Sequence, residues 1–96
     1  MRTLGRLRER IDRVDLQLLR LLNRRAAAAV RIGQLKRKEG LPVYDGRREE
    51  RLLRRLLRSN QGPLPSASVR GIFRQILRHS RQLQGRAGLL KKERIR

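Results

Sequence analysis

A single apolar register dominates the first third of the chain. From residue 4 to residue 21, Leu, Ile and Val recur at alternating steps of three and four, which places them on one face of an α-helix. The same steps then reach Arg25, Ala28, Ile32 and Leu35, so a cation stands on the face that is expected to pack. Burying a guanidinium without a partner is costly. The surroundings of Arg25 must therefore supply an anion, either a carboxylate of the protein or one of a ligand.

The chain is expected to form an all-α fold with three helices: one long, one short and one of medium length. Only 2% of the 96 residues are aromatic, and the apolar content is nearly all Leu, Ile, Val and Ala. We predict a first helix from about residue 3 or 4 to about residue 38, ended by Gly40 and Pro42. A loop over 39–46 then leads to a second helix from 46 or 47 to about 59, with Asp45 as its cap.

The segment SNQGPLPS separates the second helix from a third. Ser66 or Ser68 is the expected N-cap, and the apolar residues that follow have helical spacing. Gly85 and Gly88 weaken the helix beyond that point, and the remaining residues are basic. We therefore divide the chain into one domain at residues 1–86 and a basic C-terminal tail at residues 87–96.

The charge balance constrains the partners more than it constrains the function. The 27 Lys and Arg residues against 8 acids give a net charge of +19, which predicts non-specific binding to polyanions. The chain has no cysteine, and His79 alone cannot hold a metal ion, so we expect no metal site. No continuous apolar segment follows the basic start, so we expect a cytoplasmic protein without membrane contact.

Two further cations of the first helix, Lys36 and Arg8, are candidates to share a pocket with Arg25. Lys36 lies about three turns after Arg25 and on almost the same face. Arg8 lies before Arg25, about 25 Å away along the axis and rotated by roughly 100°, so it cannot reach the same pocket from its own helix. In a homodimer, antiparallel pairing of the long helix with its copy would bring Arg8 beside the middle of the other chain.

The second and third helices add anionic and neutral polar groups. Asp45, Arg48 and Glu49 fall at the start of the second helix, and Ser80 and Gln84 lie one turn apart on the third. A pocket of cations, one or two carboxylates, a hydroxyl and an amide suits a small ligand with two carboxylates and a hydroxyl. The set contains no nucleophile paired with a base.

The order and spacing of these residues resemble the all-α class of chorismate mutases. The matching stretch comprises LRERIDRVDLQLLRLLNRR, IGQLK, PVYDGRREERLL and IFRQILRHSRQLQ, and covers roughly residues 4 to 84. No single motif in it is specific, whereas the ordered set across three helices and both loops is. The resemblance implies an intertwined homodimer of three-helix chains, in which Arg8 of each subunit completes the site of the other.

The resemblance also implies the reaction and the residues that act on the reacting bond. Chorismate would rearrange to prephenate by a pericyclic Claisen step in phenylalanine and tyrosine biosynthesis, without cofactor, covalent intermediate or proton transfer. Arg25 and the partner's Arg8 would bind the two carboxylates and so select the compact diaxial conformer. Lys36, which would also contact a carboxylate, and Gln84 would donate hydrogen bonds to the ether oxygen and stabilise the charge that grows there.

The remaining positions of the set would hold the rest of the substrate. By the same resemblance, Glu49 and the backbone or side chain of Asp45 would hold the ring hydroxyl. Ser80 and Arg48 would line the site and contact a carboxylate or orient Glu49. The ring would be sandwiched between Ile32 and Leu77.

Three alternatives stay open from the sequence. Isochorismate pyruvate lyase uses the same type of cationic cage, although Glu49 and Asp45 favour the mutase because they fit the hydroxyl of chorismate. A basic helical protein that binds nucleic acid would explain the charge, but the chain lacks aromatic stacking residues and a groove-reading motif. Finally, Arg25 taken alone could extend to solvent from a helix edge or pair with a structural acid such as Asp15 or Glu49.

Overall fold

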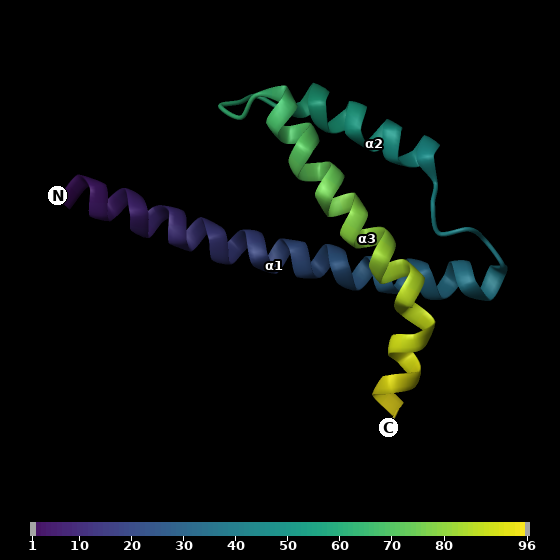
Figure 1. The fold of residues 1–96 in the computed structure, drawn as a ribbon. Helices are drawn as coiled ribbons and strands as arrows, with labels where there is room; N and C mark the ends of the chain where they lie inside the picture. Colours follow the sequence, from purple (N-terminus) through teal and green to yellow (C-terminus); the bar gives the residue numbers. More distant parts are fainter. Residues whose placement is uncertain (1, 96) are drawn as a thin grey trace.

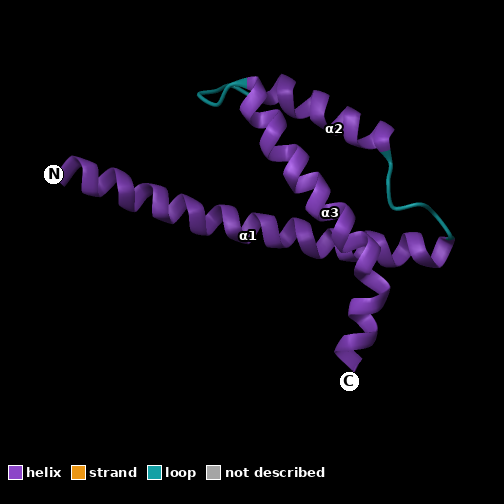
Figure 2. Ribbon diagram, in the orientation of Figure 1, coloured by secondary structure: helices purple, strands orange, loops and turns teal. Residues whose placement is uncertain are grey.

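The chain folds into three α-helices joined by two loops, in a computed structural model that describes residues 2–95 and the side chains of residues 3–87. The helices are α1 (Arg2–Glu39), α2 (Gly46–Ser59) and α3 (Ser66–Ile95), and the described part of the chain contains no strand (Figure 2). The all-α fold and the long, short and medium helices predicted from the sequence are confirmed.

The third helix packs against both of the others. α3 packs against α2 and then crosses the C-terminal half of α1, whereas the N-terminal half of α1 extends away from both (Figure 1). The resulting shape measures 55 × 36 × 14 Å and has a radius of gyration of 17.0 Å. A compact domain of this length would have a radius of about 13 Å. The single chain is therefore thin and open.

The end of α1 is built as the sequence predicts. Gly40 adopts a φ of 71°, which favours glycine because a Cβ is strained there. The amide of Leu41 donates to the carbonyl of Lys36 at 2.7 Å, and the amide of Gly40 donates to the carbonyl of Arg37 at 3.3 Å. These two bonds form a Schellman motif. It ends α1 at Glu39 and leads into the loop that runs to α2 (Figure 1).

The start of α2 is capped by Asp45, also as predicted. Its carboxylate accepts a hydrogen bond from the amide of Arg48 at 3.1 Å. The cap satisfies one of the orphan amides of the first turn, and its negative charge suits the positive end of the helix dipole. Asp45 and Glu49 are thereby placed within one turn of each other. The leucine face of α2 turns inward, and Leu53 is buried.

The predicted cap of α3 is wrong. The helix begins at Ser66, so Ser66 is its first helical residue, and Ser68 lies within the first turn. Pro65 stands at the capping position, and its carbonyl accepts from the amide of Val69 at 3.1 Å. Proline suits this place because its missing N–H leaves no donor to satisfy.

The C-terminal part of α3 continues as helix beyond the predicted domain boundary. It runs through Gly85 to Ile95 without a break at residue 86. The division into a domain at 1–86 and a basic tail at 87–96 stays a prediction.

The backbones of α1 and α3 meet closely at Gly33. A Cβ built at Gly33 would lie 2.6 Å from the Cα of Gln84, closer than any real side chain tolerates. Ala29, one turn earlier, is buried, and so is Leu77 on α3. Small residues on α1 therefore allow the crossing that brings Gln84 next to this helix.

The apolar register of α1 is largely uncovered in its N-terminal half. Its six members from residue 4 to residue 21 are 47–58% exposed: Leu4, Leu7, Ile11, Val14, Leu18 and Leu21. Apolar surface of this extent commonly marks an interaction site. None of the described helices contains a stretch that is both long enough and apolar enough to cross a bilayer.

Candidate active site

A cavity of about 360 Å³ lies between the C-terminal half of α1, the start of α2 and the middle of α3. All the site residues predicted from the sequence line it except Arg8. They are Arg25, Ile32, Lys36, Asp45, Arg48, Glu49, Leu77, Ser80 and Gln84. The loop and the crossing at Gly33 explain this convergence, since they bring three helices to one point.

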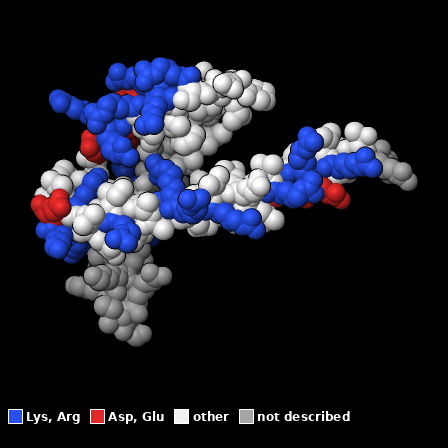
Figure 3. Space-filling view, turned by 180° about the vertical axis from the view of Figure 1, so that it is seen from behind, with Lys and Arg blue, Asp and Glu red and all other residues white. Residues whose placement is uncertain are grey.

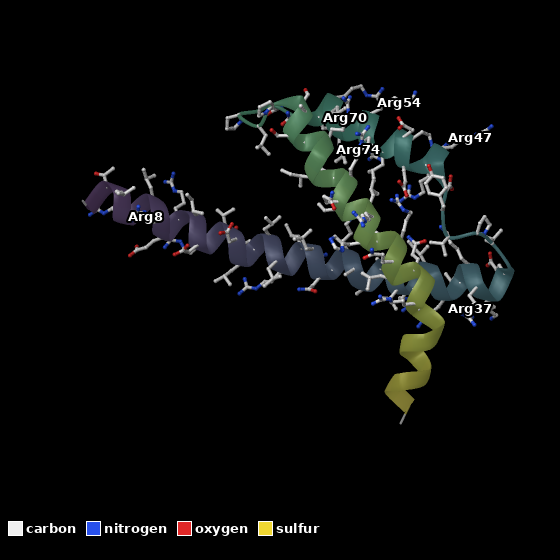
Figure 4. The ribbon with its side chains drawn as sticks, viewed as in Figure 1. Arg8, Arg37, Arg47, Arg54, Arg70 and Arg74 are labelled. Carbon is white, nitrogen blue, oxygen red and sulfur yellow. The ribbon has the colours of Figure 1, made fainter. Side chains whose placement is uncertain are left out.

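Arg8 lies outside the cavity, on the extended half of α1 (Figure 4). This agrees with the phase and distance read from the sequence, which keep Arg8 away from Arg25 of the same chain. Its predicted insertion into the cavity of a second subunit stays a prediction.

Arg25 lines the cavity and is partly buried. Within the described part of the chain, the one ion pair joins Arg81 to Glu49, and neither Asp15 nor Glu49 pairs with Arg25. The alternative in which a structural acid neutralises Arg25 is therefore wrong for the described residues. The cation faces a cavity in which a ligand can supply the anion.

Lys36 and Gln84 form a linked pair of donors on the cavity wall. The Lys36 Nζ donates to the Gln84 Oε1 at 3.0 Å and to the carbonyl of Val43 at 2.8 Å. An ammonium has three donors, so one N–H of Lys36 stays available for a ligand. Because the Oε1 accepts from Lys36, the Nε2 of Gln84 also keeps its donors. Two donors from different helices are thus held beside the same cavity.

Arg81 and Gly33 are the positions not predicted from the sequence. Arg81 lines the cavity, and its Nη1 lies 2.5 Å from the Glu49 Oε1. Arg81 lies three residues before Gln84, on a neighbouring part of the same helix face, and this spacing could have predicted that it lines the cavity. The signal for Gly33 was a glycine inside a strongly periodic helix, which usually has a packing reason.

The charges around the cavity favour a dianion. Four cations line it, namely Arg25, Lys36, Arg48 and Arg81, together with the two carboxylates of Asp45 and Glu49. Two positive charges are therefore in excess, and the Glu49 carboxylate is already paired with Arg81. Apolar walls lower the local dielectric and strengthen the attraction for a bound anion. The arrangement suits a small ligand with two negative charges and an apolar ring.

A second basic surface covers α2. Basic side chains, which on this helix are all arginines, gather there in the space-filling view (Figure 3). A groove on this helix is lined by Leu52 and five arginines: Arg48, Arg51, Arg54, Arg55 and Arg58. Such a surface attracts polyanions through charge alone. Non-specific polyanion binding stays a prediction.

The comparisons of this sequence with known proteins agree on one family. The sequence profile described as "Chorismate mutase type II" matches residues 7–85. The chain is 41% identical over 81 residues to a bifunctional chorismate mutase/prephenate dehydratase of Aquifex aeolicus, covering 80% of this chain and 22% of that protein. It is 46% identical over 70 residues to the protein of the same description in Neisseria gonorrhoeae, covering 73% and 19%. The chain thus spans about a fifth of the length of these relatives.

Solved structures show the same fold. A "Chorismate Mutase (Form II)" from Thermus thermophilus superposes with a TM-score of 0.85 at 40% identity, covering 86% of this chain and 94% of that one. A conserved hypothetical protein from Pyrococcus furiosus superposes with a TM-score of 0.71 at 38% identity, covering 85% and 95%. With a profile match over most of its length and this structural likeness, the chain belongs to the type II chorismate mutase family.

Proposed function

We propose that this chain is an isomerase that rearranges chorismate to prephenate. The observation that carries the proposal is the cavity itself. Its lining has two positive charges in excess and includes Lys36 and Gln84, which are hydrogen-bonded to each other. The lining residues hold no nucleophile activated by a base, which suits a reaction that proceeds without a covalent intermediate.

Substrate binding would use the charged and polar residues that line the cavity. Arg25 and Arg8 of the partner subunit take the two carboxylates, and Lys36 adds a contact to one of them. Glu49, whose Oε1 is held by Arg81, and Asp45 at the cap of α2 receive the ring hydroxyl. Arg48 and Ser80 complete the polar wall, and Ile32 and Leu77 enclose the ring.

The rate enhancement then comes from two physical effects. Fixing both carboxylates holds chorismate in the compact conformer, in which the two reacting carbons approach each other. As the C–O bond breaks, negative charge grows on the ether oxygen. Lys36 and Gln84 donate to that oxygen from a preorganised wall, so little reorganisation is needed as the charge develops.

A homodimer would complete the site and cover the exposed face of α1. An apolar groove of about 510 Å³ runs between α1 and α3, lined among others by Leu18, Leu22, Ile72 and Ile76. Arg25 and Ser80 line this groove as well as the cavity, so a helix docked there would lie next to the site. A second copy of α1 offers a matching apolar stripe, and it carries Arg8.

The direct test is conversion of chorismate by the purified chain, followed by ultraviolet absorbance and by detection of prephenate. Arg25→Ala should lower kcat/KM by about 100-fold or more, because a buried guanidinium–carboxylate contact is lost. Arg78→Ala, at an exposed position of α3 away from the cavity, is the matched control. A folded protein that leaves chorismate unchanged would overturn the proposal, and release of pyruvate from isochorismate alone would assign the lyase instead.

A further inference from the structure

Arg81 belongs to a cluster that joins three segments of the chain beside the cavity. Its guanidinium lies over the ring of Tyr44, with Cζ 5.5 Å from the ring centroid, and its Nη1 pairs with the Glu49 Oε1. Tyr44 belongs to the loop before α2, Glu49 to the first turn of α2, and Arg81 to α3. One cation is therefore held between an aromatic face and a carboxylate.

Gly46 makes room for this cluster. A Cβ at Gly46 would lie 2.7 Å from the Tyr44 Oη and 3.1 Å from its Cζ. The ring of Tyr44 thus folds back against the first residue of α2, and a Cβ at that residue would force the ring to shift. Gly46 leaves space for the ring of Tyr44, the Arg81 guanidinium lies over that ring, and Arg81 pairs with Glu49.

We propose that Arg81 is a positioning residue that fixes the Glu49 carboxylate for the substrate's ring hydroxyl, with Tyr44 as its support. The inference rests on the proposed function only in assigning the hydroxyl to Glu49. Arg81 occupies the Oε1, so the Oε2 is left to accept the hydroxyl hydrogen bond. Recognition of a hydroxyl-bearing ring would then depend on a residue that does not itself touch the hydroxyl.

The physical reason lies in the freedom of the two side chains. Glu49 is 21% exposed and Arg81 is 34% exposed, so neither is held by burial alone. A free glutamate would lose rotamer entropy on binding substrate, and an ordering contact made beforehand removes that cost. Arginine suits the task because its planar guanidinium can stack on a ring and pair with a carboxylate at the same time.

The main test compares kcat and KM for Arg81→Leu and Arg81→Lys with those of the native enzyme. Arg81→Leu should lower kcat/KM by about tenfold, as expected for losing a hydrogen bond to a charged group. Arg81→Lys keeps the charge but not the planar fork, and should recover part of the loss. Arg78→Leu, one turn earlier on α3 and outside the cavity, is the control and should stay at the native value.

A double-mutant cycle distinguishes positioning from direct contact with the substrate. If Arg81 acts through Glu49, Arg81→Leu should add almost nothing in a Glu49→Gln background. If Arg81 binds a substrate carboxylate directly, the two losses should multiply, which would overturn the positioning role. A chorismate analogue without the ring hydroxyl gives a second readout, since its turnover should be insensitive to Arg81→Leu.

The support from Tyr44 is tested separately. Tyr44→Phe keeps the aromatic face and should stay closer to native activity than Tyr44→Leu, for which we expect a loss of about threefold. Gly46→Ala should act like Tyr44→Leu, because the new methyl displaces the ring. Native kcat/KM in folded Arg81→Leu and Tyr44→Leu would reject this inference alone, whereas a native enzyme inactive on chorismate would reject the proposed function.

Discussion

The two halves of α1 carry the same apolar register but meet different surroundings. In the N-terminal half the register consists of large side chains that are about half exposed, from Leu4 to Leu21. In the C-terminal half α3 crosses at buried Ala29 and Gly33, which lie beside the register, whereas Ile32 and Leu35 of the register itself are 39% and 55% exposed. Periodicity thus indicates which residues share a face, while small residues beside that face allow another helix of the same chain to approach α1.

The difference also separates two kinds of function within one helix. The C-terminal half supplies Arg25, Ile32 and Lys36 to the cavity. The N-terminal half supplies none, and its exposed leucines and Arg8 suit a second subunit (Figure 4). One half would act on the substrate within its own chain, and the other would act in the neighbouring chain.

The largest effect is expected at the cavity beside the C-terminal half of α1, where Lys36 of α1 and Gln84 of α3 are proposed to act on the reacting bond. Lys36→Ala or Gln84→Ala should lower kcat by roughly 10²-fold to 10³-fold, because each removes a donor to the ether oxygen. Steady-state rates with chorismate measure this directly. A variant with near-native kcat would show that its residue does not stabilise the transition state, and circular dichroism excludes unfolding as the cause of a loss.

The role of the N-terminal half can be tested by mixing subunits. Arg8→Ala and Arg25→Ala homodimers should each be nearly inactive, since each lacks one carboxylate contact. When the two chains are mixed, half of the dimers are hybrids with one intact site of two, so about a quarter of native activity should return.

Absence of recovery after verified subunit exchange would place Arg8 outside the partner's site. A fully active monomer in sedimentation would remove the division of labour between the two halves. Native protein mixed with Arg25→Ala should keep about half of the native activity whether or not subunits exchange, so this mixture is the control for the activity of hybrid dimers.

The smallest effect is expected on stability, where α3 packs closely against the C-terminal half of α1 at Gly33. Gly33→Ala should lower the free energy of unfolding by about 1–3 kcal/mol, because the methyl group meets the Gln84 backbone. Gly71→Ala on α3 has open space around the new Cβ and should raise stability by up to about 1 kcal/mol through helix propensity. Urea unfolding at fixed protein concentration compares the two. Equal effects at both positions would refute the close crossing at Gly33.

The helices could be predicted well because their signals are local. Gly40 stops α1 and Asp45 caps α2, and both act through bonds within a few residues. The predicted cap at Ser66 or Ser68 failed because Pro65, directly before them, occupies the capping position instead. Local sequence often offers several caps within two residues, and small differences in backbone geometry select one.

The members of the cavity could also be largely predicted, but their pairings could not. Glu49 was open to pairing with Arg25, and the structure pairs it with Arg81 instead. Which cation meets that carboxylate depends on the position of α3 relative to α2. No spacing along a single helix contains that information.

Local signals along the chain were enough to predict three helices, their approximate ends and the polar residues that share faces, because periodicity and turn chemistry act over a few residues. The packing of the helices adds what those signals do not contain: α3 crosses α1 at Gly33, Lys36 donates a hydrogen bond to Gln84, and Arg25 lines an open cavity. These outcomes depend on packing between segments that are distant along the chain. In that packing, none of the carboxylates of the described residues forms an ion pair with Arg25.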